Sequence, residues 1–410
     1  MLDVSEDKNA LSQLQQLAEK LLQEKTPAFE RQALIRGAAI DSSLSLRDGE
    51  IYQLIAKARA KLKGTSSGEL PNQEIEIPEE SWLCEQLFAE RALNIVTALE
   101  KVGKSGFVSA FLGCLTYDSK EFLGHKINCE KRPIIIVGTD QPLKDWAEIL
   151  IPCGLMKKTS KNKAIILEPI KRLWHKGASI HLDEQGIEEI VSVAEENPNS
   201  IVVLDAFASL ISGIGLDENK PEATEPIRFL TEALPLDATP ILLHHSSKSR
   251  SGERASNAAR GSNALTAEAS QIIKMDWLEA GEHDQRIQIS TQGRNSTPVD
   301  LIIEQTARSH WISHGSTASV SKKEKLAQKE RDLSERQADV LEEVRDYWAN
   351  TYQGIDSKRI QELCSDHFDS PKKALSTLKQ LEKHGLLLSS KTSLDGKGDV
   401  RLFKPYVYPV

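Results

Sequence analysis

One segment, residues 93–115 with the sequence LNIVTALEKVGKSGFVSAFLGCL, constrains the fold of this chain more than any other. An apolar strand runs into a loop, the triplet Gly103-Lys104-Ser105 follows, and an amphipathic helix comes next. Backbone N–H groups of such a loop, and of the helix N-terminus behind it, bind phosphate oxygens. The segment therefore predicts a phosphate-binding site. The alternative is a strand that ends near a glycine and is followed by an ordinary helix.

The polar side chains of this loop have different expected partners. Lys104 is expected to reach the terminal phosphates of a nucleotide, and the Ser105 hydroxyl to bind Mg²⁺. The standard pattern starts with Gly for backbone freedom and close packing, but that position is Ala98 here. The nucleotide-binding residues that we predict are Ala98, Lys101, Val102, Gly103, Lys104, Ser105 and Gly106.

Short apolar runs alternate with helical segments between about residues 82 and 312. The early runs are nearly continuous in Ile, Val and Leu, as in strands that are buried on both faces of a parallel sheet. Strands that alternate with helices indicate a layered α/β domain. We expect strands at residues 92–97, 133–138, 201–204, 240–243, 271–275, 286–290 and 299–304.

Two acidic residues follow apolar strands in this region. Asp205 ends the run Ile201-Val202-Val203-Leu204, the form of a strand whose acid holds Mg²⁺ directly or through water. Asp140 follows the strand at 133–138 and could orient the attacking water. The alternatives are an Asp205 that caps the next helix and an Asp140 that only shapes the turn TDQP.

Together these motifs resemble the RecA/DnaB-like hexameric ATPases, in particular the plasmid RepA-type replicative helicases and their phage and mobile-element relatives. The family loop G-x-P-K-x-G-K-S matches residues 98–105 except at Ala98 and Glu100. Further matches are the strand end His244-His245 with Lys248, the segment 259–265, and the pair Gly293-Arg294. Asp140 stands where the family has Glu, and Ser270 where Asp is common.

The resemblance implies an α/β fold with a RecA-like P-loop NTPase core, ATP and Mg²⁺ as cofactors, and a homo-oligomer that forms a hexameric ring. It implies that His245 senses the terminal phosphate and that Arg294 acts as an arginine finger on the neighbouring subunit's nucleotide. A satisfied core histidine and an ordinary salt bridge are the respective alternatives. The polar loop after residue 246 is expected to hold single-stranded DNA in the ring channel, or to be only a solvated loop; its basic residues are Lys248, Arg250, Arg254 and Arg260.

The flanking regions predict further domains. Residues 1–72 read as an N-terminal helical region that ends in a Gly/Ser/Pro-rich linker, residues 73–313 as the ATPase domain, and residues 314–333 as a polar and charged linker. Residues 334–410 resemble a winged helix-turn-helix, with helices at 335–350, 357–366 and 371–383 and strands at 386–391 and 400–404. Duplex DNA is a candidate partner of the third helix, as an alternative to protein contacts only, through Lys372, Lys373 and Lys379.

Composition limits the remaining choices. The chain has a net charge of −8, so nucleic acid would be bound by a local patch or an oligomeric channel rather than by a cationic coat. The sequence contains no apolar run long enough to span a membrane and starts without a secretory pattern, so a cytoplasmic protein with reduced cysteines is expected.

The leading hypothesis is an ATP-dependent DNA motor, a ring helicase of a plasmid, phage or mobile element with replication proteins as further partners. Lys104, Asp140, Asp205, His245 and Arg294 would carry its chemistry. The second hypothesis is a nucleotide-controlled DNA-binding or assembly protein with little hydrolysis, which Ala98 and Asp140 favour. A recombination or defence ATPase of RecA type is a third.

Overall fold

The computed structural model describes residues 4–62 except 25 and 27, 81–246 except 219, 263–278, 284–394 except 295, and 398–406. Two compact units, Met1–Gly315 and Ser316–Val410, make up the chain. The linker expected after residue 62, the basic loop expected at 247–262 and residues 395–397 of the expected wing turn lie outside the described residues.

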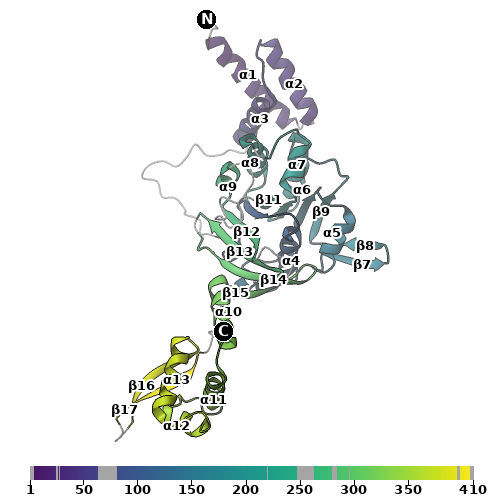
Figure 1. Ribbon diagram of the computed structural model, residues 1–410. Coiled ribbons are helices and arrows are strands. Elements are labelled where there is room, and N and C mark those ends of the chain that lie inside the picture. Colours follow the sequence, from purple (N-terminus) through teal and green to yellow (C-terminus); the bar gives the residue numbers. More distant parts are fainter. Residues whose placement is uncertain are drawn as a thin grey trace. The chain divides into compact units, whose positions relative to one another are not determined.

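A nine-stranded sheet with the order β15-β14-β13-β12-β3-β11-β10-β6-β9 forms the centre of the first unit (Figure 1). The strands from β12 to β9 are parallel, whereas β13 is antiparallel to both of its neighbours. The fold is therefore mixed α/β with a parallel core, and each of the seven predicted strands is present. Their bounds are β3 (Asn94–Ala98), β6 (Ile134–Gly138), β10 (Ile201–Leu204), β11 (Thr239–His245), β12 (Gln271–Trp277), β13 (Arg286–Gly293) and β14 (Asp300–Ala307).

Helices cover both faces of this sheet because alternate residues of a buried strand point to opposite sides. On one face α4 (Lys104–Thr116) and α5 (Leu143–Leu150) bury Phe107, Phe111 and Trp146. On the other face the second core includes Phe207 and Leu230. Its helices are α6 (Glu184–Glu195), α7 (Phe207–Ser212), α8 (Glu225–Ala233), which follows the short 3₁₀ helix Pro221–Thr224, and α9 (Asn263–Glu268).

Three N-terminal helices, α1 (Val4–Gln23), α2 (Ala28–Asp41) and α3 (Asp48–Leu62), share a small apolar core of their own. Helix α2 contacts α6, and α3 contacts α8. The buried Arg31 donates to Glu184 Oε1 at 2.7 Å and also pairs with Glu188. Removing either partner would leave a buried charge, so this network fixes the helices to the sheet domain.

Several short or edge strands are present without a matching sequence prediction. Two are the sheet edges β9 (Ile170–His175) and β15 (His310–Ser316). The others form three separate two-stranded hairpins: β1 (Trp82–Cys84) with β2 (Phe88–Ala89), β4 (Glu121–Phe122) with β5 (His125–Lys126), and β7 (Met156–Ser160) with β8 (Lys163–Ile166). Most are too short to display a period-2 pattern.

The second unit contains α10 (Thr317–Arg331), α11 (Glu335–Thr351), α12 (Ser357–Leu363), α13 (Pro371–Lys383) and the hairpin of β16 (Leu387–Leu394) with β17 (Gly398–Pro405). The apolar positions Ala374, Leu378 and Leu381 of α13 are buried in its core, as the helical spacing predicted. The polar linker expected at 314–333 is mostly helix α10, because Ser316 caps it by accepting from Ser319 N.

Two findings bear on the compartment. None of the described helices has both the length and the apolar character needed to cross a bilayer. All five cysteines are free thiols.

Candidate functional site

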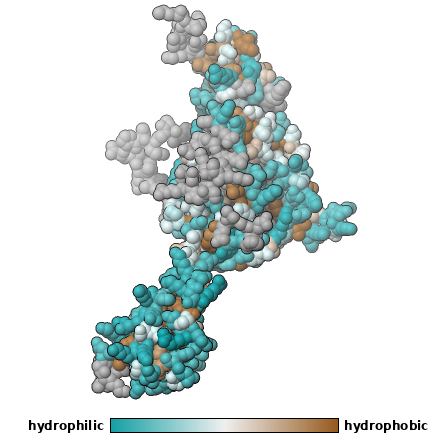
Figure 2. All heavy atoms as spheres, viewed as in Figure 1, coloured by the Kyte–Doolittle hydropathy of each residue, from teal (hydrophilic) through white to brown (hydrophobic). Residues whose placement is uncertain are grey.

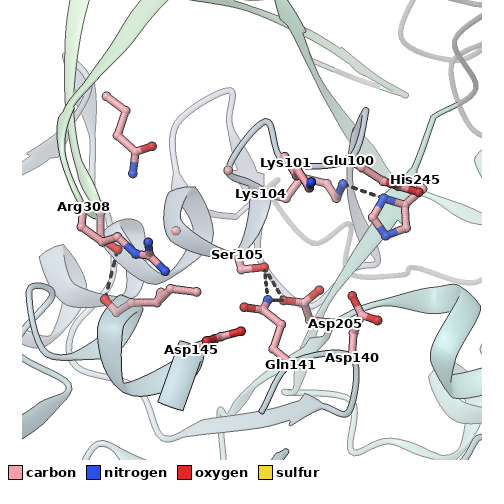
Figure 3. A pocket seen from close by; sticks show the side chains of 15 residues that line it. Glu100, Lys101, Lys104, Ser105, Asp140, Gln141, Asp145, Asp205, His245 and Arg308 are labelled. Atoms are coloured by element: carbon pink, nitrogen blue, oxygen red, sulfur yellow. Dashed lines mark hydrogen bonds between the residues drawn. The ribbon is translucent and has the colours of Figure 1, made fainter. Parts of the chain in front are cut away.

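The candidate site lies where the parallel strands end. The register pairs Ala98 of β3 with His245 of β11, and Leu204 of β10 with Val137 of β6. The residues that follow these strands therefore meet at one edge of the sheet, where open parallel sheets bind their ligands. Four predicted residues lie together there, around a cavity of about 700 Å³ (Figure 3): Lys104, Asp140, Asp205 and His245.

The phosphate loop has the backbone conformation that its glycine permits. Gly103 directly precedes α4 with φ of 101°, and a side chain there would come within 3.2 Å of the Trp311 ring. Lys101 also has a positive φ of 64°. Gly103, Lys104, Ser105 and Gly106 line the cavity, so the α4 N-terminus opens onto it. Backbone N–H groups at such an end favour anions.

Two predicted loop residues take no part in the cavity lining. Ala98 is fully buried, and its carbonyl accepts from Lys104 Nζ at 3.1 Å and from Ser246 N at 2.9 Å. Val102 is buried in the core beside α4. Both residues therefore shape the loop from behind rather than present a side chain to a ligand.

Lys104 is held by the loop and by the neighbouring strand. Its ammonium donates to the Leu99 carbonyl at 3.2 Å and to His245 Nδ1 at 3.0 Å. Burial lowers the pKa of His245, and the adjacent Lys104 charge lowers it further. A neutral imidazole is consistent with its accepting role, since an ammonium group can only donate.

Ser105, Asp205 and Gln141 form a hydrogen-bonded cluster at the floor of the cavity. Ser105 Oγ donates to Asp205 Oδ2 at 2.5 Å, and Gln141 Nε2 donates to Ser105 Oγ at 2.8 Å and to Asp205 Oδ2 at 3.2 Å. Burial raises the pKa of Asp205 to about 6, and Asp140 raises it too, although Ser105 and Lys104 oppose the shift. A buried carboxylate that favours protonation is one that a cation would stabilise.

Asp140 is an exposed residue beside this cluster. Its charge acts on both Asp205 and His245, which places it near each of them. Figure 3 shows Asp140 beside Asp205 on the side toward His245. Its carboxylate is thus available to solvent inside the cavity.

Several residues that line the cavity carry no signal in the sequence. Gln141 directly follows Asp140 in a turn and matches no motif. Gln305 and Arg308 come from β14 and the turn after it, about 200 residues from the phosphate loop. Figure 3 shows Arg308 at the opposite end of the cavity from His245. Arg308 also pairs with Glu148 of α5 at 3.0 Å.

Arg294 lies away from this cavity. It follows β13, whose last residue Gly293 pairs with Gln271 at the start of β12. Gln271 also pairs with Asn94, the first residue of β3, so Arg294 is at the opposite edge of the sheet from Lys104. The exposed Arg294 guanidinium donates to the Ala267 carbonyl at 2.7 Å.

The remaining predicted DNA-binding residues fall into two sets. Lys248, Arg250, Arg254 and Arg260 lie outside the described residues. Lys372, Lys373 and Lys379 are exposed on α13 in the second unit. Lys373 forms an ion pair with Asp369 at 2.6 Å.

A magnesium nucleotide fits the donor set of the cavity. The α4 N-terminus and Lys104 suit phosphate oxygens, and Ser105 and Asp205 provide the oxygen ligands that Mg²⁺ prefers. No three His, Cys, Asp or Glu side chains in the described ranges are grouped to hold a metal. Mg²⁺ would therefore be shared with the phosphates, as is usual for this ion.

Comparison with known proteins agrees with this geometry. Residues 58–251 match a family model described as an AAA domain (AAA_25), and this span contains the phosphate loop and Asp205. The match and the parallel-cored sheet support a RecA-like P-loop ATPase domain in the first unit.

Two solved structures resemble the chain. A KaiC-like protein from the archaeon Pyrococcus horikoshii OT3 is 14% identical, with 57% of this chain and 93% of that chain covered and a TM-score of 0.39. The second, a protein solved as an isolated ATPase domain, is 11% identical, with 65% and 99% covered and a TM-score of 0.40. No curated protein matches the sequence.

Proposed function

We propose that this protein is an ATP-dependent DNA motor, a ring-forming replicative helicase of a plasmid, phage or mobile element. The observation that carries the proposal is the cluster of Ser105, Asp205 and Gln141 beside Lys104, at the mouth of a phosphate loop. Phosphate-binding and metal-binding groups converge there at the carboxyl edge of a parallel sheet. That arrangement serves phosphoryl transfer, which depends on positioning and charge neutralisation.

Each side chain has a role that follows from its surroundings. Lys104 would exchange its contacts with the Ala98 and Leu99 carbonyls for phosphate oxygens, which are stronger acceptors. Ser105 and Asp205 would hold the cation. Mg·ATP, when bound, supplies the phosphoanhydride bond and the metal charge that offsets the phosphates.

Asp140 and His245 would act at the terminal phosphate. The exposed Asp140 carboxylate can accept a hydrogen bond from water within the cavity and so orient it. His245 contacts Lys104 from the end of the neighbouring strand, so a change at the phosphates would alter the position of its ring. Gln305 and Arg308, at the other end of the cavity, would face the nucleoside.

The ring and its DNA contacts are further parts of the proposal. Arg294 is exposed and distant from its own cavity, as a residue that serves a neighbouring subunit must be. Single-stranded DNA would lie in the central channel against residues 247–262. We propose that α11–α13 with β16 and β17 form a winged helix and that Lys372, Lys373 and Lys379 meet duplex phosphates.

A second function, nucleotide-controlled assembly on DNA with little hydrolysis, is favoured by one observation. Asp140 stands where a longer Glu is expected, and its carboxylate is exposed rather than held by the cluster at the floor of the cavity. A carboxylate one methylene short would position water less well. Nucleotide binding would be unaffected.

The test is ATP hydrolysis and unwinding of a forked duplex by the full-length protein, with and without single-stranded DNA. The motor predicts hydrolysis that single-stranded DNA stimulates, together with strand separation. Asp140→Asn should abolish both activities and leave ATP binding intact. ATP binding without turnover in every condition would contradict the motor and support the assembly function.

A further inference from the structure

The β7–β8 hairpin is the most basic feature of the first unit. Residues 156–176, which include the hairpin and the edge strand β9, contain seven Lys and Arg and a single Glu. Their net charge is +6, so the other 389 residues carry −14. A local charge of this sign in an acidic chain calls for an anionic partner or a structural reason.

The hairpin is also fully open to solvent. Every residue from 157 to 166 is exposed, including Ile165 at 56%. Figure 1 shows β7 and β8 projecting from the side of the sheet domain, and Figure 2 shows the same projection as a largely hydrophilic arm. Its base is anchored, because Met156 is buried in the core beneath α4 and α5.

The lysines are distributed around the two-stranded ribbon. The register pairs Lys157 with Ile165 and Lys158 with Ala164, so these two lysines point to opposite faces. Lys161 lies in the turn at the tip, and Lys163 begins the return strand. None of these four lysines has a carboxylate partner among the residues that the structure describes.

Strand β9 extends the basic surface along the sheet edge. Arg172 is exposed and lies over the Trp174 ring at 5.6 Å from its centroid. Lys171, by contrast, pairs with Glu168. The edge therefore offers an arginine held on an aromatic ring, a combination suited to phosphate and base contacts.

We propose that the β7–β8 hairpin is a binding site for duplex nucleic acid, occupied through its phosphates and without sequence preference. A two-stranded ribbon fits the major groove of DNA, which is about 12 Å wide. Lysines on both faces and at the tip can then reach the phosphates of both groove walls. This site goes beyond the proposed function, whose DNA contacts are residues 247–262 and helix α13.

A purely structural reason for the lysines is protection of exposed strand edges against pairing with other chains. That role requires charge of either sign. Phosphate binding requires positive charge, so substitutions that keep the charge but reverse its sign separate the two explanations.

The experiment measures binding of the nucleotide-free, full-length protein to a labelled duplex of random sequence, about two helical turns long, by fluorescence anisotropy over a range of salt concentrations. Two variants carry four changes each, K157Q/K158Q/K161Q/K163Q and K157E/K158E/K161E/K163E. The control variant removes four exposed lysines elsewhere in the same unit, K20Q/K57Q/K120Q/K126Q.

The expected result is a duplex affinity at least about tenfold weaker for the glutamine variant, with a log–log salt slope shallower by about 3 to 4. The glutamate variant should bind still more weakly and stay soluble, and the control should bind as the wild type does. ATP affinity should be the same in all four proteins, which separates this site from the nucleotide cavity.

Three results would overturn the proposal. One is unchanged duplex binding by both hairpin variants, including the case in which they only alter self-association by sedimentation, as an acidic protein partner would predict. Another is an equal loss in the control, which would show an effect of net charge alone. A loss confined to single-stranded DNA would exclude the duplex as the ligand.

Discussion

At the residue scale, Asp205 is the side chain whose environment is least favourable to its charge. Burial and the Asp140 carboxylate raise its pKa to about 6, against about 3.9 in an unfolded chain. The folded state therefore binds more protons than the unfolded state between about pH 4 and pH 6. It follows that this group lowers the stability of the nucleotide-free protein as pH rises through that window.

Asp205→Asn should stabilise the nucleotide-free protein at about pH 7.5 while it weakens metal-dependent nucleotide binding. The amide keeps an acceptor for Ser105 and removes the buried charge, so the free energy of unfolding should rise by about 1–3 kcal/mol. At about pH 5, where the wild-type carboxyl is mostly protonated, the gain should shrink. Urea unfolding at both pH values measures it.

The matched control is Asp145→Asn, which alters a second acid of the same cavity. It should not raise stability, because Asp145 lies in the first turn of α5, where a negative charge is favourable. A destabilised Asp205→Asn protein at neutral pH would contradict the account of this carboxyl group.

The roles of single residues were predicted to different extents. Lys104, Ser105 and Asp205 stand in local patterns, a loop before a helix and an acid after a strand, so the sequence sufficed to place them. Gln141 and Arg308 reach the cavity only through tertiary contacts. A glutamine in a turn and an arginine between two strands carry no local signal of that placement.

At the scale of elements, the phosphate loop depends on the positive φ of Gly103. The same φ, near 100°, occurs at Gly177, where an added side chain would meet nothing within 4 Å. The two glycines therefore separate backbone strain from crowding, since only Gly103 faces a ring, that of Trp311.

Gly103→Ala and Gly177→Ala should each lower the free energy of unfolding by about 1–2 kcal/mol, because both force a non-glycine residue into a left-handed conformation. Only Gly103→Ala should also weaken ATP binding, since it shifts the loop against Trp311. Chemical denaturation and ATP titration of both variants measure the two effects. Equal loss of ATP binding in both would show that the loop effect is not local.

Whether an element could be predicted depended on its burial. The strands β3, β6 and β10 are buried along their whole length and appear in the sequence as runs of Ile and Val. The hairpin strands β7 and β8 are short and almost entirely exposed, so no alternation marks them. The edge strand β9, with the sequence IKRLWH, is hidden for the same reason.

At the scale of the whole molecule, the chain joins a nucleotide-type sheet domain to a smaller helical unit with a terminal hairpin. The change of pattern near residue 314 is visible in the sequence because strands are followed by a charged helical run. The distribution of charge was only partly visible. The sequence pattern favours residues 247–262 and α13 as basic surfaces, whereas the concentration of cations at 156–176 acquires meaning only with the exposed hairpin.

The central claim is that the cavity around Lys104, Ser105 and Asp205 binds Mg·ATP. Its most direct test is calorimetric titration of a non-hydrolysable ATP analogue with Mg²⁺ into the wild type, Lys104→Ala and Lys144→Ala, the last being an exposed lysine on nearby α5. A charged hydrogen bond contributes about 1.5–3 kcal/mol, so Lys104→Ala should bind about 10- to 100-fold more weakly. Lys144→Ala should bind as the wild type does. Absence of binding by the wild type, or equal affinity in wild type and Lys104→Ala, would contradict the account.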